Sequence, residues 1–240
     1  MKAAILALPL LAALTAGCAG LPHTKASPVR TAANTASAGP ALNRAAQDEL
    51  YLGVVSGLIK QKRYGAAIAF LNDYAAKTAP DARYEMLRGD AMLGANRHDE
   101  AVTAYAAALA YGTRAPAYNG IGRALSEQKR WSEAALNFRR ATSLDPTNAK
   151  YLNNLGYAEL QQELPSTAAA VLRQAHELQP GSTVIRNNLI LAAAMSQDQA
   201  QYTALLGTIV DAKERSSVAH FAASWTGWGG PVAPKQKAVP

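Results

Sequence analysis

A repeat of fixed length constrains the fold of this chain more than any other feature of its sequence. The segment 115–148 can be laid over the segment 149–182 with a shift of 34 residues and no gap. A chain that repeats at this period is expected to form a row of similar units, each in contact with its neighbours. Six positions match in kind: Ile121 with Leu155, Gly122 with Gly156, Ala134 with Ala168, Phe138 with Leu172, Ala141 with Ala175, and Pro146 with Pro180.

The matched small residues predict where helices lie close together. Each repeat is long enough for two antiparallel helices, a first helix A and a second helix B. Gly122 and Gly156 are expected where A meets B, because a side chain there would push the helices apart. Ala134 and Ala168 allow the same close approach from helix B. The two matched prolines are expected to end helix B, since proline cannot continue a helix interior.

A 34-residue period with small residues at repeat positions 8, 20 and 27 and proline at position 32 resembles the tetratricopeptide repeat, TPR. The resemblance implies an all-α fold, a right-handed superhelical array of helix-turn-helix repeats (an α-solenoid). The last repeat has drifted, with Ile190 in place of the glycine and Tyr202 in place of the alanine, as a terminal repeat is expected to do. The same register extends to about five repeats, near 48–81, 82–114, 115–148, 149–182 and 183–216.

The first residues have the form of a secretory signal peptide. One lysine precedes an apolar run from Ala3 to Leu14, which is shorter than the roughly 20 residues of a membrane-spanning helix. The following segment, residues 14–18, reads LTAGC and resembles the bacterial lipobox. In that family, signal peptidase II cuts before the cysteine, which becomes lipid-modified and N-terminal. We therefore predict a signal peptide over residues 1–17.

Cys18 is the only cysteine in the chain, so it cannot form an internal disulfide. The lipobox resemblance makes it the lipidation site, and ordinary secretion with a spare thiol is the alternative. Ala19 after the cysteine resembles lipoproteins sorted to the outer membrane. The expected localisation is the outer membrane, through a palmitate-type lipid anchor, with the folded domain facing the periplasm.

Composition separates the folded part of the chain from its flanks. Residues 18–43 are rich in Ala, Ser, Thr, Pro and Gly without apolar periodicity, and we predict a flexible linker. The repeat domain is expected over 44–223, including a helix after the fifth repeat. Residues 224–240 are rich in Gly and Pro, which predicts a disordered tail.

The sequence favours a binding surface over an enzyme. The four histidines are scattered without metal-ligand spacing, and neither a nucleophile elbow nor a phosphate-binding glycine loop is present. We therefore predict a protein without catalytic residues, cofactor or metal. The net charge of +7 comes without a basic run interleaved with aromatic residues, so nucleic acid is not an expected partner.

The expected partner site is the concave groove, which helix A lines in TPR arrays. Groove-facing residues recur near positions 2, 5, 6, 9, 12 and 13 of each repeat. An asparagine amide both donates and accepts, which suits an extended peptide backbone. The alternative is that the asparagines bond neighbouring repeats and serve only stability. The predicted protein-binding residues are Asn119, Asn153 and Asn187 at position 5, Asn154 and Asn188 at position 6, and Arg123 and Tyr157 at position 9.

The chain resembles the TPR lipoproteins of tight-adherence (Flp) pilus assembly, the TadD type. The resemblance rests on the lipobox, on the repeat over 88–109 and on the segments 153–180 and 184–194. It implies a scaffold that binds pilus subunits or the secretin and assists their assembly at the outer membrane. A pilotin-like lipoprotein of type IV pilus biogenesis has a similar layout. An envelope adaptor that docks cell-wall hydrolases or proteases would need the same groove for other partners.

Overall fold

The computed structural model describes residues 43–226 of the 240-residue chain, and in that range every regular element is a helix. The predicted signal peptide, the lipidation site at Cys18, the linker before Asn43 and the end of the tail lie outside the described residues. The helices are α1 (Arg44–Lys60), α2 (Tyr64–Ala75), α3 (Ala82–Gly94), α4 (His98–Leu109), α5 (Arg114–Glu127), α6 (Trp131–Leu144), α7 (Ala149–Gln161), α8 (Pro165–Leu178), α9 (Thr183–Met195), α10 (Gln199–Gly207) and α11 (Ala212–Thr226).

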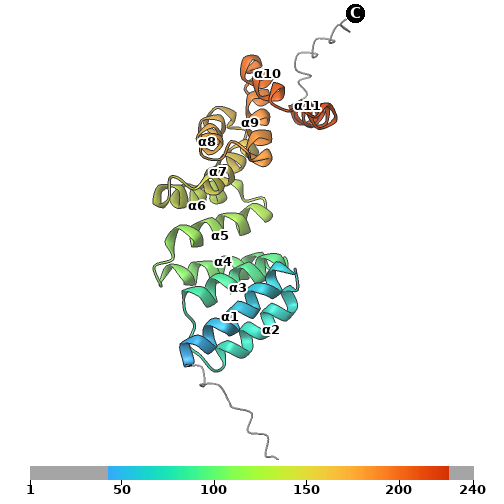
Figure 1. Ribbon diagram of the computed structural model, residues 1–240. Coiled ribbons are helices and arrows are strands. Elements are labelled where there is room, and N and C mark those ends of the chain that lie inside the picture. Colours follow the sequence, from blue (N-terminus) through green and yellow to red (C-terminus); the bar gives the residue numbers. More distant parts are fainter. Residues whose placement is uncertain (1–42, 227–240) are drawn as a thin grey trace, which may run out of the picture. The chain divides into compact units, whose positions relative to one another are not determined.

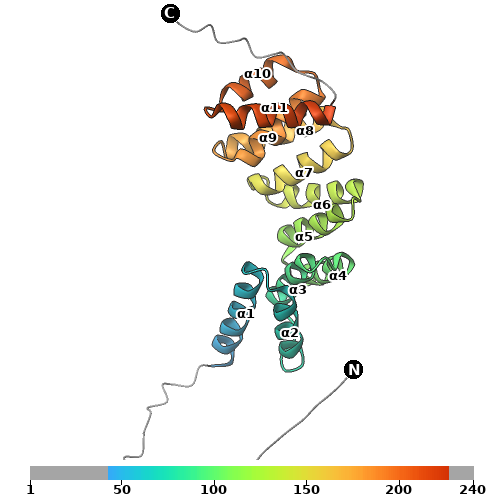
Figure 2. The same cartoon turned by 90° about the vertical axis from the view of Figure 1, so that its right-hand side faces the viewer.

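The first ten helices form five successive A–B pairs, from α1/α2 to α9/α10. Within each pair the two helices pack on each other, and each B helix also packs on the A helix of the following pair (Figures 1 and 2). Helix α11 follows the fifth pair and packs on α9. None of the described helices is long and apolar enough to cross a membrane.

Each turn from helix A to helix B is built in the same way. One residue in the turn, at repeat position 15, adopts a left-handed conformation with φ between 57° and 60°. Glycine is the usual residue for that conformation, yet here the position carries side chains. The helices on either side of the turn, and not a glycine, therefore account for this recurring left-handed conformation. For that reason the sequence does not mark the turn residue. The five residues are Lys62, Asn96, Lys129, Glu163 and Gln197.

The predicted close approach of helices A and B occurs at the matched glycines. A Cβ atom added at Gly122 would lie 2.6 Å from the Phe138 ring, and one at Gly156 would lie 2.5 Å from Cγ of Leu172. Real Cβ atoms do not come so close to other heavy atoms, so these sites have no room for a side chain. Ala134 is fully buried on the facing helix, as the repeat pattern predicts.

The side chain of Tyr105 in α4 fills the space that two glycines leave open. Its ring lies over Gly89 of its own repeat and over Gly120 of the next, with added Cβ atoms 2.5 and 2.6 Å from it respectively. The side chain is fully buried in a core cluster with Ile121 and Ala124. One aromatic ring therefore joins two successive repeats.

The end of the helical region differs from the prediction. Helix α11 continues to Thr226, whereas the sequence places the start of a disordered tail at residue 224. Phe221 and Trp225 are one helical turn apart, and their rings meet edge to face with centroids 5.7 Å apart. Aromatic contacts between residues i and i+4 stabilise a helix, and residues 224–226 contain neither glycine nor proline. The helix therefore continues into the first residues of the predicted tail.

Candidate protein-binding groove

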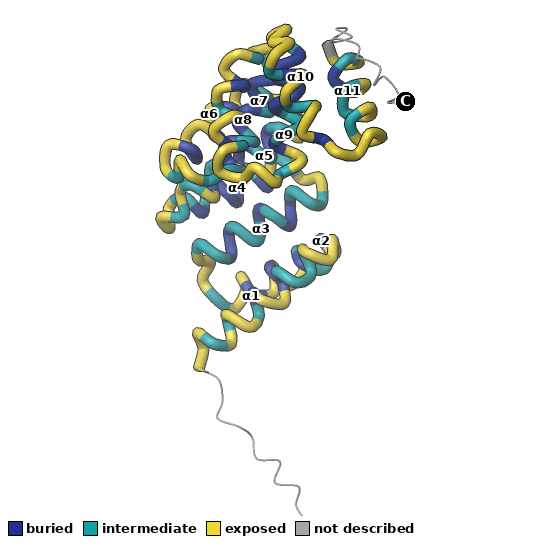
Figure 3. Tube along the Cα trace, turned by 45° about the horizontal axis from the view of Figure 1, so that its top comes forward, coloured by how far each residue is buried: buried dark blue, intermediate teal, exposed yellow. Residues whose placement is uncertain are grey.

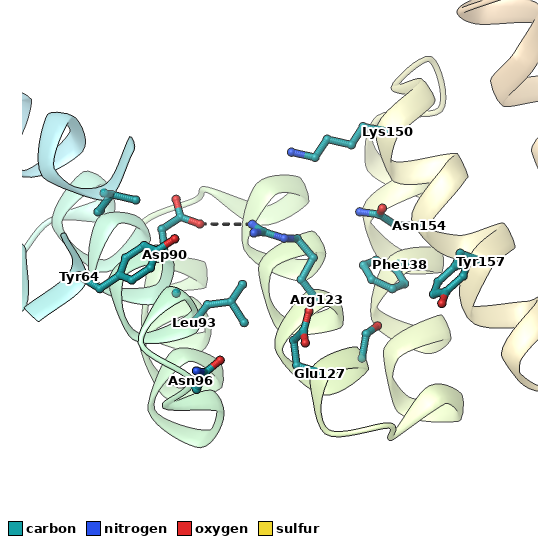
Figure 4. A pocket seen from close by; sticks show the side chains of 13 residues that line it. Tyr64, Asp90, Leu93, Asn96, Arg123, Glu127, Phe138, Lys150, Asn154 and Tyr157 are labelled. Carbon is teal, nitrogen blue, oxygen red and sulfur yellow. Dashed lines mark hydrogen bonds and ion pairs between the residues drawn. The ribbon is translucent and has the colours of Figure 1, made fainter. Parts of the chain in front are cut away.

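A cavity of about 650 Å³ opens on the side of the array formed by the A helices. Helices α3, α5 and α7 supply most of its lining, and Figure 4 shows their side chains converging from three successive repeats. The half-buried Leu93 and Tyr157 supply apolar surface, whereas Phe138 lines the cavity with only 2% of its surface exposed. The lining residues are Ile59, Tyr64, Asp90, Leu93, Gly94, Asn96, Arg123, Ser126, Glu127, Phe138, Lys150, Asn154 and Tyr157.

Asp90 is held in the cavity wall by two partners. Oδ1 of Asp90 accepts a hydrogen bond of 2.7 Å from the Tyr105 hydroxyl and lies 3.3 Å from a guanidinium nitrogen of Arg123 (Figure 4 draws the ion pair). Burial raises the pKa of Tyr105 far above its usual range, and the charge of Asp90 raises it further. The tyrosine is therefore a permanent donor at physiological pH, and it fixes the carboxylate that orients Arg123.

Two further charges stand in the cavity without an ion-pair partner among residues 43–226. Lys150 lies in the first turn of α7, and Glu127 is the last residue of α5. Both side chains line the cavity and are exposed. A cation and an anion are thus both available to a ligand, in addition to the Asp90–Arg123 pair. Tyr157 is oriented by an edge-to-face contact with Trp131, with ring centroids 6.0 Å apart.

The asparagines form side-chain pairs between successive A helices. Nδ2 of Asn154 donates to Oδ1 of Asn119 at 2.8 Å, and Nδ2 of Asn188 donates to Oδ1 of Asn153 at 2.9 Å. The position-6 amide of one repeat therefore bonds the position-5 amide of the repeat before it. Asn187, whose repeat is the last, accepts from Nε of Arg186 at 3.4 Å instead.

The comparisons with known proteins identify the architecture. A family profile for the TPR repeat matches residues 122–163. The fold is a TPR array. The predicted fold class, an all-α right-handed superhelical array of TPR repeats, is therefore confirmed, and the five A–B pairs are its repeats.

Solved structures of other TPR proteins superpose on most of the chain. PilF of Pseudomonas aeruginosa has a TM-score of 0.62 at 18% sequence identity, covering 74% of this chain and 83% of PilF. MamA of Desulfovibrio magneticus RS-1 has a TM-score of 0.56 at 18% identity, covering 73% and 95%. YrrB, described as a TPR protein with an unusual peptide-binding site, has a TM-score of 0.55 at 16% identity, covering 74% and 90%. No curated protein sequence matches the chain. At these identities the likeness establishes the fold alone.

The TPR array brings three of the seven predicted binding residues into one cavity. Arg123, Asn154 and Tyr157 line it. Asn119 is 6% exposed and lies beneath Asn154, where it serves as a hydrogen-bond acceptor. The three others, Asn153, Asn187 and Asn188, are half-buried on α7 and α9 and lie outside the cavity lining.

Three charged lining residues, Asp90, Glu127 and Lys150, are not among the predicted binding residues. Glu127 occupies position 13 of the third repeat, which the TPR resemblance directs into the groove. Asp90 occupies position 9 of the second repeat, the same position as Arg123 and Tyr157, so the repeat register alone could have found it. Lys150 occupies position 2 of the fourth repeat, which the TPR resemblance also directs into the groove. Within the described part of the chain, no group of three or more His, Cys, Asp or Glu side chains could hold a metal ion.

Proposed function

We propose that the groove of this TPR array binds an extended segment of a partner protein. The cavity between α3, α5 and α7 carries this proposal, because it is the place where side chains of three successive repeats converge. Its volume of about 650 Å³ lies within the roughly 300–1,000 Å³ typical of ligand pockets. Asn154 uses its Nδ2 on Asn119 and still lines the cavity, where its carbonyl oxygen can accept from a peptide N–H.

The chemistry of the lining describes the segment that fits. An acidic side chain of the partner would pair with Lys150, and a basic one with Glu127, since neither has an ion-pair partner among the described residues. An apolar side chain of the partner would pack on Leu93 and on the ring of Tyr157, which are both half-buried. The proposed ligand is therefore an extended segment with charges of both signs around an apolar anchor.

The finer assignment is a role in assembly of the tight-adherence pilus and its secretin at the outer membrane, with the protein held there by lipid on Cys18. The lipobox and the sequence resemblance to the TadD-type lipoproteins support it. The type IV pilotin-like protein and the envelope adaptor remain the alternatives, because each would use the same TPR groove with a different partner.

Site-specific crosslinking in intact cells tests the proposed function. We expect the photoreactive amino acid p-benzoylphenylalanine at position 157, in place of Tyr157, to crosslink the protein to a secretin or pilus subunit. Arg173, an exposed residue of α8 outside the cavity, is the matched control position and should give no such product. Mass spectrometry of the crosslinked species identifies the partner and the segment bound.

The captured protein decides between the candidate roles. Hydrolases or proteases crosslinked at position 157 but not at position 173 would keep the groove and replace the pilus role by the adaptor role. Equal crosslinking at both positions would contradict the groove as the binding site. A charge reversal, Lys150→Glu, should reduce the specific product at least several-fold if an acidic partner side chain faces this lysine.

The membrane anchor has its own test. We expect Cys18→Ser to remove the protein from the outer-membrane fraction, because the thiol is the proposed site of lipid attachment and of the cleavage that precedes sorting. Immunoblotting of separated membrane and soluble fractions measures the change. Persistence of the Cys18→Ser protein in the outer-membrane fraction would contradict a lipid anchor at this residue, whereas retention in the inner membrane is what an uncleaved signal peptide would cause.

A further inference from the structure

The outer side of α1 is apolar and exposed. Leu50 is 63% exposed and Val54 is 45% exposed, and Gly53 and Gly57 share their face of the helix at spacings of three and four residues. We call these four residues the α1 outer face. Figure 3 shows α1 at the end of the row of helices, with long exposed stretches. An inner repeat of such an array contacts a neighbour on both sides, whereas α1 packs only on α2 and α3 among the described helices.

The repeat register shows what normally covers such a face. The α1 outer face occupies positions 3, 6, 7 and 10 of the first repeat. In the third repeat these positions are all buried, and Ile121 at position 7 is only 7% exposed. Positions 3, 7 and 10 are buried in the fourth and fifth repeats too. The corresponding residues of the third repeat are Ala117, Gly120, Ile121 and Ala124.

In the third repeat, α4, the B helix of the preceding repeat, provides this cover, whereas positions 6 and 7 of the second repeat (Leu87 and Arg88) are only half-buried. Ile121 and Ala124 share a core cluster with Tyr105 of α4, whose ring also fills the space above Gly120. Gly53 stands at the position equivalent to Gly120, and a Cβ added there would meet no heavy atom within 4 Å. The α1 outer face is therefore a repeat-stacking surface whose neighbouring helix is missing among the described residues.

The shape and charge of the α1 outer face favour a second copy of the same helix. Leu50 and Val54 project from it, while Gly53 and Gly57 leave open space beside them. A surface that has both projections and hollows can be complementary to itself, which a two-fold symmetric contact requires. None of the four residues is ionisable, so two copies can meet here without desolvating a charge.

We propose that this chain self-associates through the α1 outer face, with the α1 helices of two copies packed about a two-fold axis. The projecting Leu50 and Val54 of one copy lie over the glycines of the other. This contact continues the helix stacking of the array, and it is separate from the groove between α3, α5 and α7. A contact of one helix pair is small for a protein interface, so the association is weak, with a dissociation constant on the order of micromolar.

Sedimentation of the purified full chain in detergent, over about 1–100 µM, measures this association. The wild-type mass should rise from monomer toward dimer across the series. The double variant Leu50→Glu with Val54→Glu should weaken the association at least tenfold, because two carboxylates would be buried on each side of the contact. Its thermal unfolding should stay near that of the wild type, since both side chains are already exposed.

The matched control places the same substitutions on another helix. Leu136 and Leu144 of α6 are 48% and 46% exposed, and Leu136→Glu with Leu144→Glu should leave the association unchanged. Disulfide formation between copies carrying Val54→Cys, and its absence for Leu136→Cys, would locate the contact on α1. A wild type that stays monomeric over the whole series would overturn the proposal, as would equal weakening by both double variants.

Discussion

Replacement of Tyr105 by alanine should lower the free energy of unfolding by about 3–5 kcal/mol. The ring is fully buried and occupies the space above two glycines that belong to different repeats, Gly89 and Gly120. Removing it leaves a cavity that the surrounding backbone cannot fill by a local shift, because both floors of the cavity are helices. It also removes the hydroxyl that bonds Asp90 in the groove.

Two control variants separate the parts of this effect. Tyr105→Phe keeps the ring and should cost only about 1 kcal/mol, the net value of one hydrogen bond. Tyr111→Ala, in which the truncated ring is half exposed, should change stability by less than about 0.5 kcal/mol. Urea denaturation followed by circular dichroism measures all three. A Tyr105→Ala protein as stable as Tyr105→Phe would show that the ring does not join the repeats.

Gly156→Leu should destabilise the array by about 1–3 kcal/mol through overpacking. The first carbon of a new side chain would already lie 2.5 Å from Cγ of Leu172, and three more carbons must follow it. Leu172 is itself fully buried and has no free volume to enter. Helices α7 and α8 must therefore move apart, which loosens the packing of the fourth repeat. The decrease in melting temperature measures this change.

The same substitution at an open glycine provides the comparison. Gly65 lies in α2, and a Cβ there would meet no heavy atom within 4 Å. Gly65→Leu should leave stability unchanged or slightly higher, because leucine is the better helix former by up to about 1 kcal/mol. Adding Leu172→Ala to Gly156→Leu should recover part of the loss by making room for the new side chain. A Gly156→Leu melting temperature equal to that of the wild type would contradict close packing at position 8.

The fold was predictable because its main constraints are steric and periodic. A glycine at position 8 and an alanine at position 20 indicate that helices A and B lie close together, independently of the residues around them. The A–B turns were less predictable, since residues such as Lys62 and Glu163 adopt positive φ without being glycine. Helix packing on both sides sets that backbone conformation, so the residue type does not reveal it.

The candidate site was predictable only in part. The register directs positions 2, 5, 6 and 9 toward the groove, and Arg123, Asn154 and Tyr157 do line the cavity. The pairing of Asn154 with Asn119 depends on how far one A helix is shifted and rotated against the next, which the register does not specify. The ion pair of Asp90 with Arg123 depends on the same geometry, whereas the hydrogen bond that Asp90 accepts from Tyr105 depends on the packing of α3 on α4 within one repeat.

The sequence by itself determined the repeat length, the helix pairs and the sites of closest packing, because small residues at fixed intervals allow only one way of bringing the helices together. The tertiary structure decided which polar side chains bond one another and which remain open to a partner. That choice depends on how successive helices are shifted and rotated against one another. The burial of equivalent positions in successive repeats also shows that α1 carries a stacking face without a neighbour among residues 43–226, which the sequence alone does not reveal.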